Sequence, residues 1–162
     1  MLSWLESTSL GVWLRESPSV WSFPAILTLH TTGMAILIGA SFVLDLRLLG
    51  IGRNVALSAF RWVFPVVAVG LVVNLVTGVM LFVKNATVWG TAVPFLIKMA
   101  LVIASVATLV PIRRYVVDLP AEASAQAEAR STEAGGRVLA IASILLWSGA
   151  VTAGRLLAYL VV

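Results

Sequence analysis

Apolar residues along the chain are grouped into four long stretches separated by short polar segments. The stretches cover approximately residues 22–46, 60–83, 93–112 and 138–161. A helix needs roughly 20 mostly apolar residues to cross the hydrocarbon core of a bilayer, and each stretch is long enough. Because short connections place consecutive helices side by side and antiparallel, the pattern predicts an all-α integral membrane four-helix bundle, with residues 1–162 forming a single domain.

The first twenty residues have a different pattern. Apolar residues recur there at helical spacing, at Trp4, Leu5, Leu10, Trp13 and Leu14. Charged residues interrupt this segment and no basic start precedes it, so we do not expect a conventional signal peptide. We expect a short interfacial helix that anchors the chain, since tryptophan rings favour the headgroup level of a membrane.

The composition supports a membrane protein and excludes several kinds of chemistry. Of the 162 residues, 60% are hydrophobic and 11% are charged, and the mean hydropathy is +1.05. These values are typical of integral membrane proteins. The chain has no cysteine, which rules out disulfides, thiolate metal sites and haem attached through cysteine.

The basic residues are distributed by loop, so the net charge of +4 is not interpreted as a nucleic-acid-binding surface. Arginines flank the first and third connections, at Arg47, Arg53, Arg61, Arg113, Arg114, Arg130 and Arg137. The opposite side carries only Arg15 and Lys84. Since positive residues remain in the cytoplasm, we expect a multi-pass protein of the bacterial inner (cytoplasmic) membrane with periplasmic N- and C-termini.

Polar side chains interrupt all four spans at a similar depth from the outer side. They are His30 in the first span, Asn74 and Thr77 in the second, Lys98 in the third and Arg155 in the fourth. At about 1.5 Å per residue, they lie roughly 6 to 15 Å from the outer ends of their spans. An ionisable group is costly within a bilayer, so the single histidine is a functional hypothesis by default. The inner half has no comparable layer.

Each of these residues alone also has a structural interpretation. Lys98 and Arg155 can extend to the headgroups, Asn74 and Thr77 can join helices by hydrogen bonds, and His30 can be a core residue. Together they leave an uncompensated positive site. Haem b fits that site, with His30 as the metal ligand, Lys98 and Arg155 beside the propionates, and Asn74 and Thr77 as supporting groups. A quinone headgroup is the alternative cofactor, although it explains the imidazole less well.

Neighbouring residues extend the haem hypothesis. Gly33 lies about one turn from His30, where a missing side chain would let a porphyrin face approach. Met34, Met80 and Met99 are candidates for a second axial ligand, and packing is the alternative role for each. One histidine per chain excludes two histidine ligands from one chain. The sixth position is therefore open, filled by another residue, or supplied by sharing haem in a homo-oligomer.

At the inner end, Asp45 and Arg47 are expected to form an ion pair that fixes the first helix, with no catalytic role. Pro111 and the arginines after it are expected to close the third span. Residues 118–136 are rich in Ala and Glu and are expected to extend a helix or to form a mobile connection without chemistry.

Several short motifs together suggest a family resemblance. They are LHTTGM at 29–34, DLRLLG at 45–50, NLVTG at 74–78, IKM at 97–99 and GRLLAY at 154–159. With these motifs, nearly the whole chain resembles an uncharacterised family of small bacterial four-span membrane proteins. More distantly it is similar to HemJ-type protoporphyrinogen oxidases and to the membrane domain of CopD-like proteins. HemJ-type proteins bind b-type haem and depend on a histidine and a lysine early in two spans, which implies those roles for His30 and Lys98.

Three functional hypotheses follow. The first is a haem-b-binding inner-membrane protein for electron transfer or redox sensing, with a quinone or a redox protein as partner. The second is a HemJ-like or quinone-linked oxidoreductase, so the sequence does not decide whether the chain is an enzyme. The third is a non-redox transport component or a structural membrane subunit, and the apolar inner half argues against transport of a soluble substrate.

Overall fold

The computed structural model describes residues 2–117 and 134–160, all of which lie in helices, turns or loops. Its elements are α1 (Ser3–Glu6), α2 (Ser9–Glu16), α3 (Phe23–Leu48), η1 (Leu57–Trp62), α4 (Val63–Lys84), α5 (Ala86–Trp89), α6 (Val93–Val116) and α8 (Ala134–Leu160). Four segments are long and apolar enough to cross a membrane: Phe23–Leu48, Leu57–Lys84, Val93–Val116 and Ala134–Leu157. The all-α four-helix bundle is thereby confirmed, and the fold is that of a multi-pass membrane protein. Arg130 and most of the Ala- and Glu-rich stretch lie outside the described residues.

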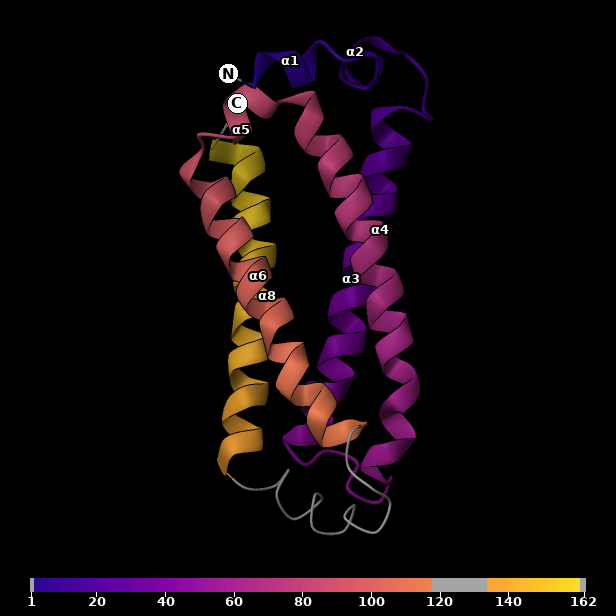
Figure 1. Ribbon diagram of the computed structural model, residues 1–162, viewed down its shortest axis with the longest axis vertical. Helices are drawn as coiled ribbons and strands as arrows, with labels where there is room; N and C mark the ends of the chain where they lie inside the picture. The colour runs from indigo at the N-terminus through magenta and orange to yellow at the C-terminus, as the bar shows by residue number, and fades with distance from the viewer. Residues whose placement is uncertain (1, 118–133, 161–162) are drawn as a thin grey trace.

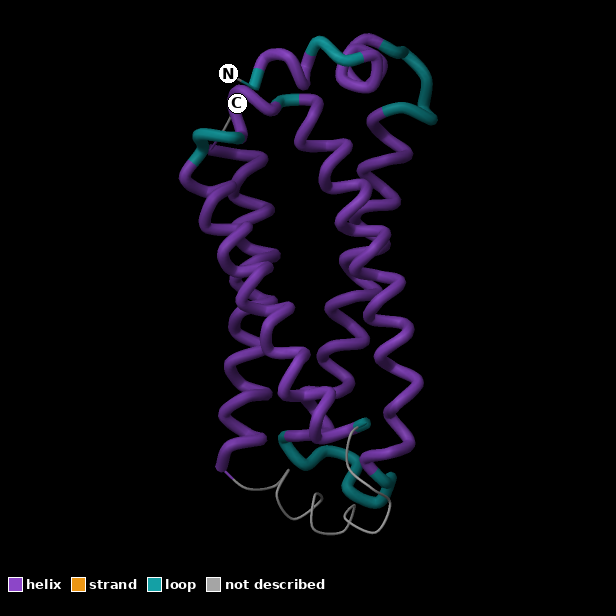
Figure 2. Tube along the Cα trace, viewed as in Figure 1, coloured by secondary structure: helices purple, strands orange, loops and turns teal. Residues whose placement is uncertain are grey.

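The four long helices run alternately up and down (Figure 1). We call the end that carries α1 and α2 the upper end, as in Figure 1, and the opposite end the lower end. Helix α3 packs against α4, α6 packs against α8, and α3 also contacts α8. The bundle is therefore two antiparallel helix pairs, and the connections described between the long helices lie at its ends (Figure 2).

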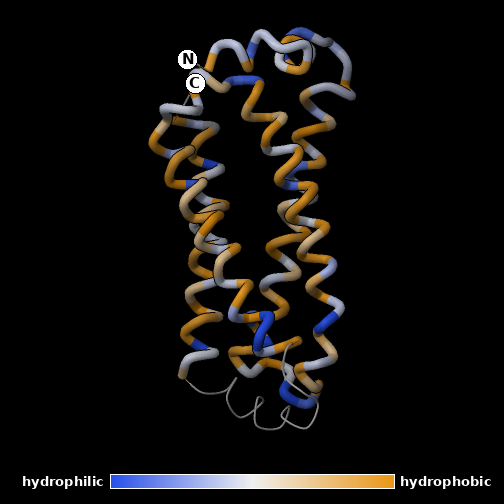
Figure 3. The backbone as a smooth tube through the Cα atoms, viewed as in Figure 1, coloured by the Kyte–Doolittle hydropathy of each residue, from blue (hydrophilic) through white to orange (hydrophobic). Residues whose placement is uncertain are grey.

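The apolar core lies in the lower half of the bundle. Its buried members come from all four long helices and η1: Leu37, Leu44, Leu48, Leu57, Val63, Val67, Ile112, Val116, Ala140 and Trp147. Large apolar side chains on the outward faces remain exposed, as at Leu75 on α4, Ile103 on α6 and Leu145 on α8. Figure 3 shows hydrophobic residues along the whole length of these helices. Such a surface suits contact with lipid tails, whereas a soluble monomer rarely exposes so large an apolar area.

Two glycines bring α3 and α4 close together. A Cβ atom on Gly70 would lie 2.7 Å from the backbone nitrogen of Leu37, and one on Gly33 would lie 2.8 Å from Cγ1 of Val73. Both positions would clash with any larger residue, so the helix axes approach to a distance that only glycine allows. This close contact sets which side chains of α3 and α4 meet above it.

The observed bounds of α6 differ from those of the predicted third span at one of its two prolines. Pro94 lies in the first turn of α6, where a residue needs no backbone N–H donor. Pro111 does not close the third span. Helix α6 continues through it to Val116. The missing N–H costs one intrahelical hydrogen bond, and Ile112 and Val116, both buried in the core, hold the last turn in place.

The N-terminal segment forms two short helices instead of the single one expected, and Figure 1 shows both across the upper end. Thr8 begins α2, and its Oγ1 accepts a hydrogen bond of 3.2 Å from the Gly11 backbone N–H. The segment is held by Glu6, whose Oε1 accepts 2.7 Å and 2.6 Å bonds from the backbone N–H and the hydroxyl of Thr87. These bonds, the hydroxyl first, lower the pKa of the Glu6 carboxyl, and the charge of Arg15 acts in the same direction.

Candidate cofactor site

His30 joins α3 to α4 in the upper half of the bundle. Its Nδ1 lies 3.0 Å from Oγ1 of Thr77, and the Asn74 side-chain amide donates a 3.0 Å hydrogen bond to the backbone carbonyl of His30. The imidazole is half-buried, whereas Thr77 is only 2% exposed. Three of the residues predicted to form a polar layer are therefore in direct contact.

The partners of Thr77 decide which imidazole nitrogen carries the proton. A hydroxyl has one proton to donate, and Thr77 Oγ1 lies 2.6 Å from the carbonyl oxygen of Val73 on its own helix. With its proton donated there, the oxygen acts as the acceptor for His30. The Nδ1–H then donates to Thr77, and the lone pair of a neutral imidazole lies on Nε2. Histidines that bind metals are oriented in this way, with the second nitrogen bonded to a fixed acceptor.

Gly78 provides the surface on which the imidazole lies. A Cβ atom at this position would be 3.2 Å from Cε1 of His30 and 3.6 Å from its Nδ1. Thr77 and Gly78 are consecutive on α4, so one fixes the ring by a hydrogen bond and the other makes room for it. From the sequence, Gly78 is one of several span glycines that could let helices pack closely or make room for a flat cofactor. Its role depends on which side of α4 faces His30.

Lys98 enters the same region from α6. The side chain is half-buried and lies along α8, where a Cβ atom on Gly154 would be 3.3 Å from its Cε and 3.6 Å from its Nζ. The ammonium acts electrostatically on the His30 imidazole. Within the described residues, no hydrogen bond or ion pair is made by this ammonium. A cation with free donors therefore lies near the histidine.

Arg155 is placed differently from the other polar residues. Its guanidinium donates a 2.9 Å hydrogen bond to the hydroxyl of Tyr159 and lies 5.2 Å from the centre of that ring. Both residues are exposed on α8. The neighbouring Gly154, and not Arg155, is on the side of α8 that meets Lys98. The structure thus does not bring Arg155 into contact with His30.

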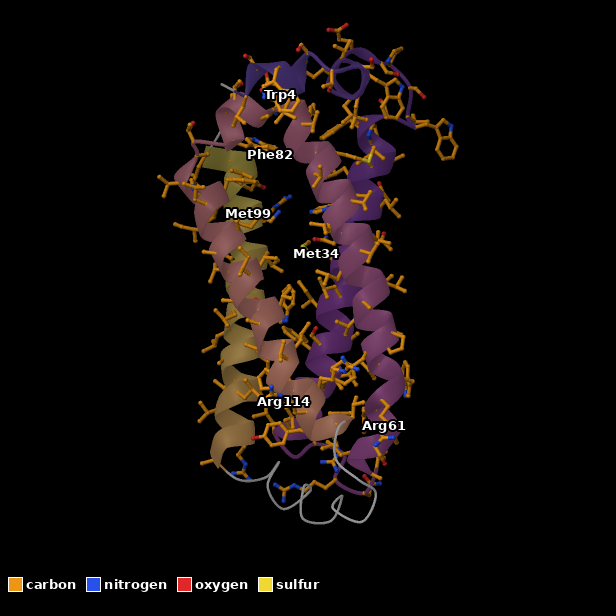
Figure 4. The ribbon with its side chains drawn as sticks, in the orientation of Figure 1. Trp4, Met34, Arg61, Phe82, Met99 and Arg114 are labelled. Atoms are coloured by element: carbon orange, nitrogen blue, oxygen red, sulfur yellow. The ribbon has the colours of Figure 1, made fainter. Side chains whose placement is uncertain are left out.

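Gly33 does not leave an open space beside His30, as the sequence suggested. The space next to it is occupied by α4, because its Cβ position would meet Val73 and the backbone nitrogen of Asn74. Among the methionines, Met34 and Met99 are half-buried on α3 and α6. Figure 4 shows Met34 on the side of α3 that faces the other helix pair, and Met99 on α6 above it. Met80 is half-buried on α4.

The donor set restricts the kind of metal that the site could hold. In the residues that the structure describes, no group of three or more His, Cys, Asp or Glu side chains could hold a metal ion. A bare transition-metal ion normally needs three or four protein ligands. A metal held mainly by its own macrocycle needs only one or two, and this is the condition that a single oriented histidine meets.

The lower half contains a buried polar contact that the sequence did not predict. Asp45, which has no exposed surface, accepts a 2.8 Å hydrogen bond at Oδ2 from the Ser143 hydroxyl on α8. Arg47 instead donates bonds of 3.1 Å and 2.9 Å to the carbonyl oxygen of Val55. The expected Asp45–Arg47 pair is therefore wrong, because residues two apart on a helix point in different directions.

Asp45 also shows that the lower half is not uniformly apolar. Its Oδ1 and the Trp147 Nε1 are buried, and neither finds a hydrogen-bond partner within the described residues. Trp147 is four residues after Ser143, so both lie on one side of α8. Asp45 itself was visible in the sequence as a carboxylate in a span. Ser143 and Trp147 gave no such signal, since serine and tryptophan are common in apolar helices.

Comparison of the chain with protein-family models, with curated proteins and with solved structures finds no match. The class of protein is defined by the fold as an all-α, multi-pass membrane protein. Its function is argued below from the site.

Proposed function

We propose that this protein binds b-type haem through His30 and serves in electron transfer or redox sensing within the membrane. The observation that carries the proposal is the bond between His30 and Thr77. The hydroxyl is committed to Val73 at 2.6 Å and accepts from His30 Nδ1 at 3.0 Å, which leaves Nε2 as the ligand atom. A bound haem would supply a one-electron redox couple, and the protein would supply its orientation and charge environment.

The charge of the site supports an anionic ligand. Lys98 and the imidazole interact electrostatically, and within the described part of the chain the Lys98 ammonium makes no ion pair. Haem carries two propionate groups, so Lys98 is positioned to neutralise one of them. Arg155 follows Gly154, which contacts Lys98, and we assign it the second propionate after release of Tyr159. Pairing of this kind offsets the cost of a buried cation.

Three methionines would be candidates to hold a bound haem together with His30. Met34 is one turn from His30 on α3 and would reach the group from the same side as His30. Met99 on α6 would reach it from the facing helix pair. Met80 is on α4, which packs with α3 and so belongs to the same helix pair as His30.

The distribution of basic residues also indicates on which side of the membrane the His30 site would lie. The basic residues of the described chain are concentrated at the lower end, among them Arg53, Arg61, Arg113 and Arg114. By the positive-inside rule the lower end lies in the cytoplasm of a bacterium, and the His30 site lies towards the periplasmic side of the inner membrane. An electron donor or acceptor on that side, or a quinone in the membrane, is the corresponding partner.

The proposal is tested by a reduced-minus-oxidised absorption spectrum of the detergent-purified protein, produced with ample haem supply. We expect a Soret band and a sharp reduced α band in the wild type and in Thr31→Ala, and their loss in His30→Ala. Thr31 is the matched control, because it adjoins His30 but its hydroxyl bonds the Leu27 carbonyl of its own helix. A wild type that is colourless, or a His30→Ala variant that retains the spectrum, would overturn the proposal.

A quinone-linked oxidoreductase is a second candidate, favoured by one observation. His30 Nε2 and the Lys98 ammonium come from facing helix pairs, and neither has a hydrogen-bond partner among the described residues. The ammonium can donate to a carbonyl oxygen of a quinone, and the lone pair of Nε2 can accept from a hydroxyl of the corresponding quinol. This candidate predicts quinol oxidation that is lost in Lys98→Met even where a haem spectrum persists. Absence of turnover in a haem-loaded wild type would leave electron transfer or sensing as the function.

A further inference from the structure

A groove between α4 and α6 at the lower end is separate from the His30 site. It has a volume of about 470 Å³, which is within the usual range for small-ligand sites. Its walls are mainly apolar, with Phe64, Val67 and Leu71 from α4 and Leu109 from α6. The groove exists because α4 packs mainly on α3, and α6 packs mainly on α8.

Two arginines line the groove at its lower end, namely Arg61 and Arg113. Arg61 donates to the carbonyl oxygens of Val116 and Val117, at 3.4 Å and 3.1 Å, so its guanidinium is fixed against the last turn of α6. Arg113 is exposed. The groove is therefore basic at the end of the membrane span and apolar along the span itself.

We propose that this groove binds a phospholipid with an anionic headgroup. Along η1 and α4 the lining residues extend from Arg61 to Leu71, roughly 15 Å at about 1.5 Å per residue. An acyl chain lying parallel to the helices would cover the apolar walls, and its phosphate would reach the two arginines. Guanidinium groups bind phosphate oxygens in pairs of charge-assisted hydrogen bonds, and basic pockets between membrane helices suit anionic lipids.

The charge of the groove selects between lipid classes. A zwitterionic headgroup would bring its own cation close to Arg61 and Arg113, whereas phosphatidylglycerol adds only negative charge. Among the described residues that line the groove, none is acidic. We therefore expect phosphatidylglycerol to bind about tenfold more tightly than phosphatidylcholine with the same acyl chains.

The test is a lipid titration of the full-length, delipidated protein in detergent, followed by native mass spectrometry. Arg113→Gln is expected to reduce phosphatidylglycerol affinity about tenfold and to bring it close to that of phosphatidylcholine. Arg114→Gln is the matched control, because it removes the same charge from the next residue, which does not line the groove. It is expected to bind as the wild type does.

A second variant tests the apolar part without changing charge. Ala68 is exposed and lines the groove, so Ala68→Phe fills it and is expected to reduce binding of phosphatidylglycerol. Equal binding of the two lipids by the wild type, or equal losses in Arg113→Gln and Arg114→Gln, would overturn the proposal. Wild-type affinity in Ala68→Phe would overturn the placement of the acyl chain.

Discussion

The hydroxyl of Ser143 donates a 2.8 Å hydrogen bond to the carboxyl of Asp45, from α8 to α3, and both residues are fully buried. This contact lies where the two helix pairs are joined. Within the described residues, the Asp45 side chain makes this hydrogen bond through Oδ2, and its other carboxyl oxygen, Oδ1, has no partner. The carboxyl therefore depends strongly on Ser143.

Ser143→Ala is expected to destabilise the protein by about 1 to 3 kcal/mol, because it leaves a buried carboxyl without its hydrogen bond. Denaturant or thermal unfolding in detergent measures the change. Ser105→Ala is the control, since this equally buried hydroxyl bonds the Leu101 carbonyl of its own helix. Adding Asp45→Leu to Ser143→Ala is expected to recover stability, because a well-packed apolar pair replaces a polar group without a partner. Equal losses in the two serine variants would contradict this account.

Gly70→Ala is expected to separate α3 from α4 and to destabilise the protein by about 1 to 3 kcal/mol. The added Cβ would lie 2.7 Å from a backbone atom of Leu37, which has no rotamer by which to move away. Gly39 on α3 has nothing within 4 Å of its Cβ position, so Gly39→Ala is expected to be neutral or stabilising by up to about 1 kcal/mol. Unfolding curves of both variants and of the wild type measure these changes in stability. Equal stability of Gly70→Ala and Gly39→Ala would contradict the prediction.

Thr77→Val is expected to weaken haem retention by about 10- to 100-fold if His30 is the axial ligand, because the group that orients the ring is lost at nearly constant volume. Thr77→Ser keeps the hydroxyl and is expected to retain most of the affinity. The rate of haem transfer to an excess of apomyoglobin measures retention. Thr31→Val changes a hydroxyl that bonds within its own helix, and a loss as large as that of Thr77→Val would point to a general effect on folding.

Lys98→Met is expected to lower the midpoint potential of a bound haem by roughly tens of millivolts. Removing a nearby positive charge disfavours the reduced state, and loss of the propionate partner acts in the same direction. Methionine keeps an unbranched stem beside Gly154, so the packing with α8 is largely preserved. A redox titration in detergent gives the potential, and Arg53→Met at the lower end serves as the distant control. A potential that is unchanged in Lys98→Met would remove Lys98 from the site.

The attachment of α1 to α5 is expected to depend on pH. Bonds from the Thr87 hydroxyl and N–H hold the Glu6 pKa below its ordinary value of 4.5. A depressed folded-state pKa means that the stabilisation is present above about 4.5 and is lost as the pH falls through the folded-state value. Fluorescence of a variant that retains Trp4 as the reporter of this segment is expected to change over that range. In Glu6→Gln the same acid-dependent change is expected to be absent.

The four spans were predictable because a membrane helix is recognised from the length and hydropathy of a single segment, and a bilayer tolerates few charges in about twenty residues. The side of each helix that faces the rest of the bundle was not predictable. The spans are apolar on all sides, so their sequences do not encode a single buried face. Consecutive residues differ by about 100° around a helix, and that difference is why Gly154 meets Lys98 while Arg155 turns to Tyr159.

A glycine in a span can serve either close helix packing or space for a cofactor, and only the packing of the helices shows which role applies. Gly33 and Gly78 both lie near His30, and either could have left room for a cofactor. Gly33 accommodates the neighbouring helix, whereas Gly78 accommodates the imidazole. The pairing of Asp45 was equally hidden, since its partner lies 98 residues away on α8. Contacts between helices depend on their rotation and their depth in the bundle, and local sequence carries neither.

The position of the core has a consequence for the order of assembly. Buried apolar residues from all four long helices meet in the lower half, so the chain can reach its final topology through that half alone. If the His30 site holds a ligand as proposed, that ligand can arrive after the helices have inserted and associated. Its loading would then be a late step in the maturation of an already folded membrane protein.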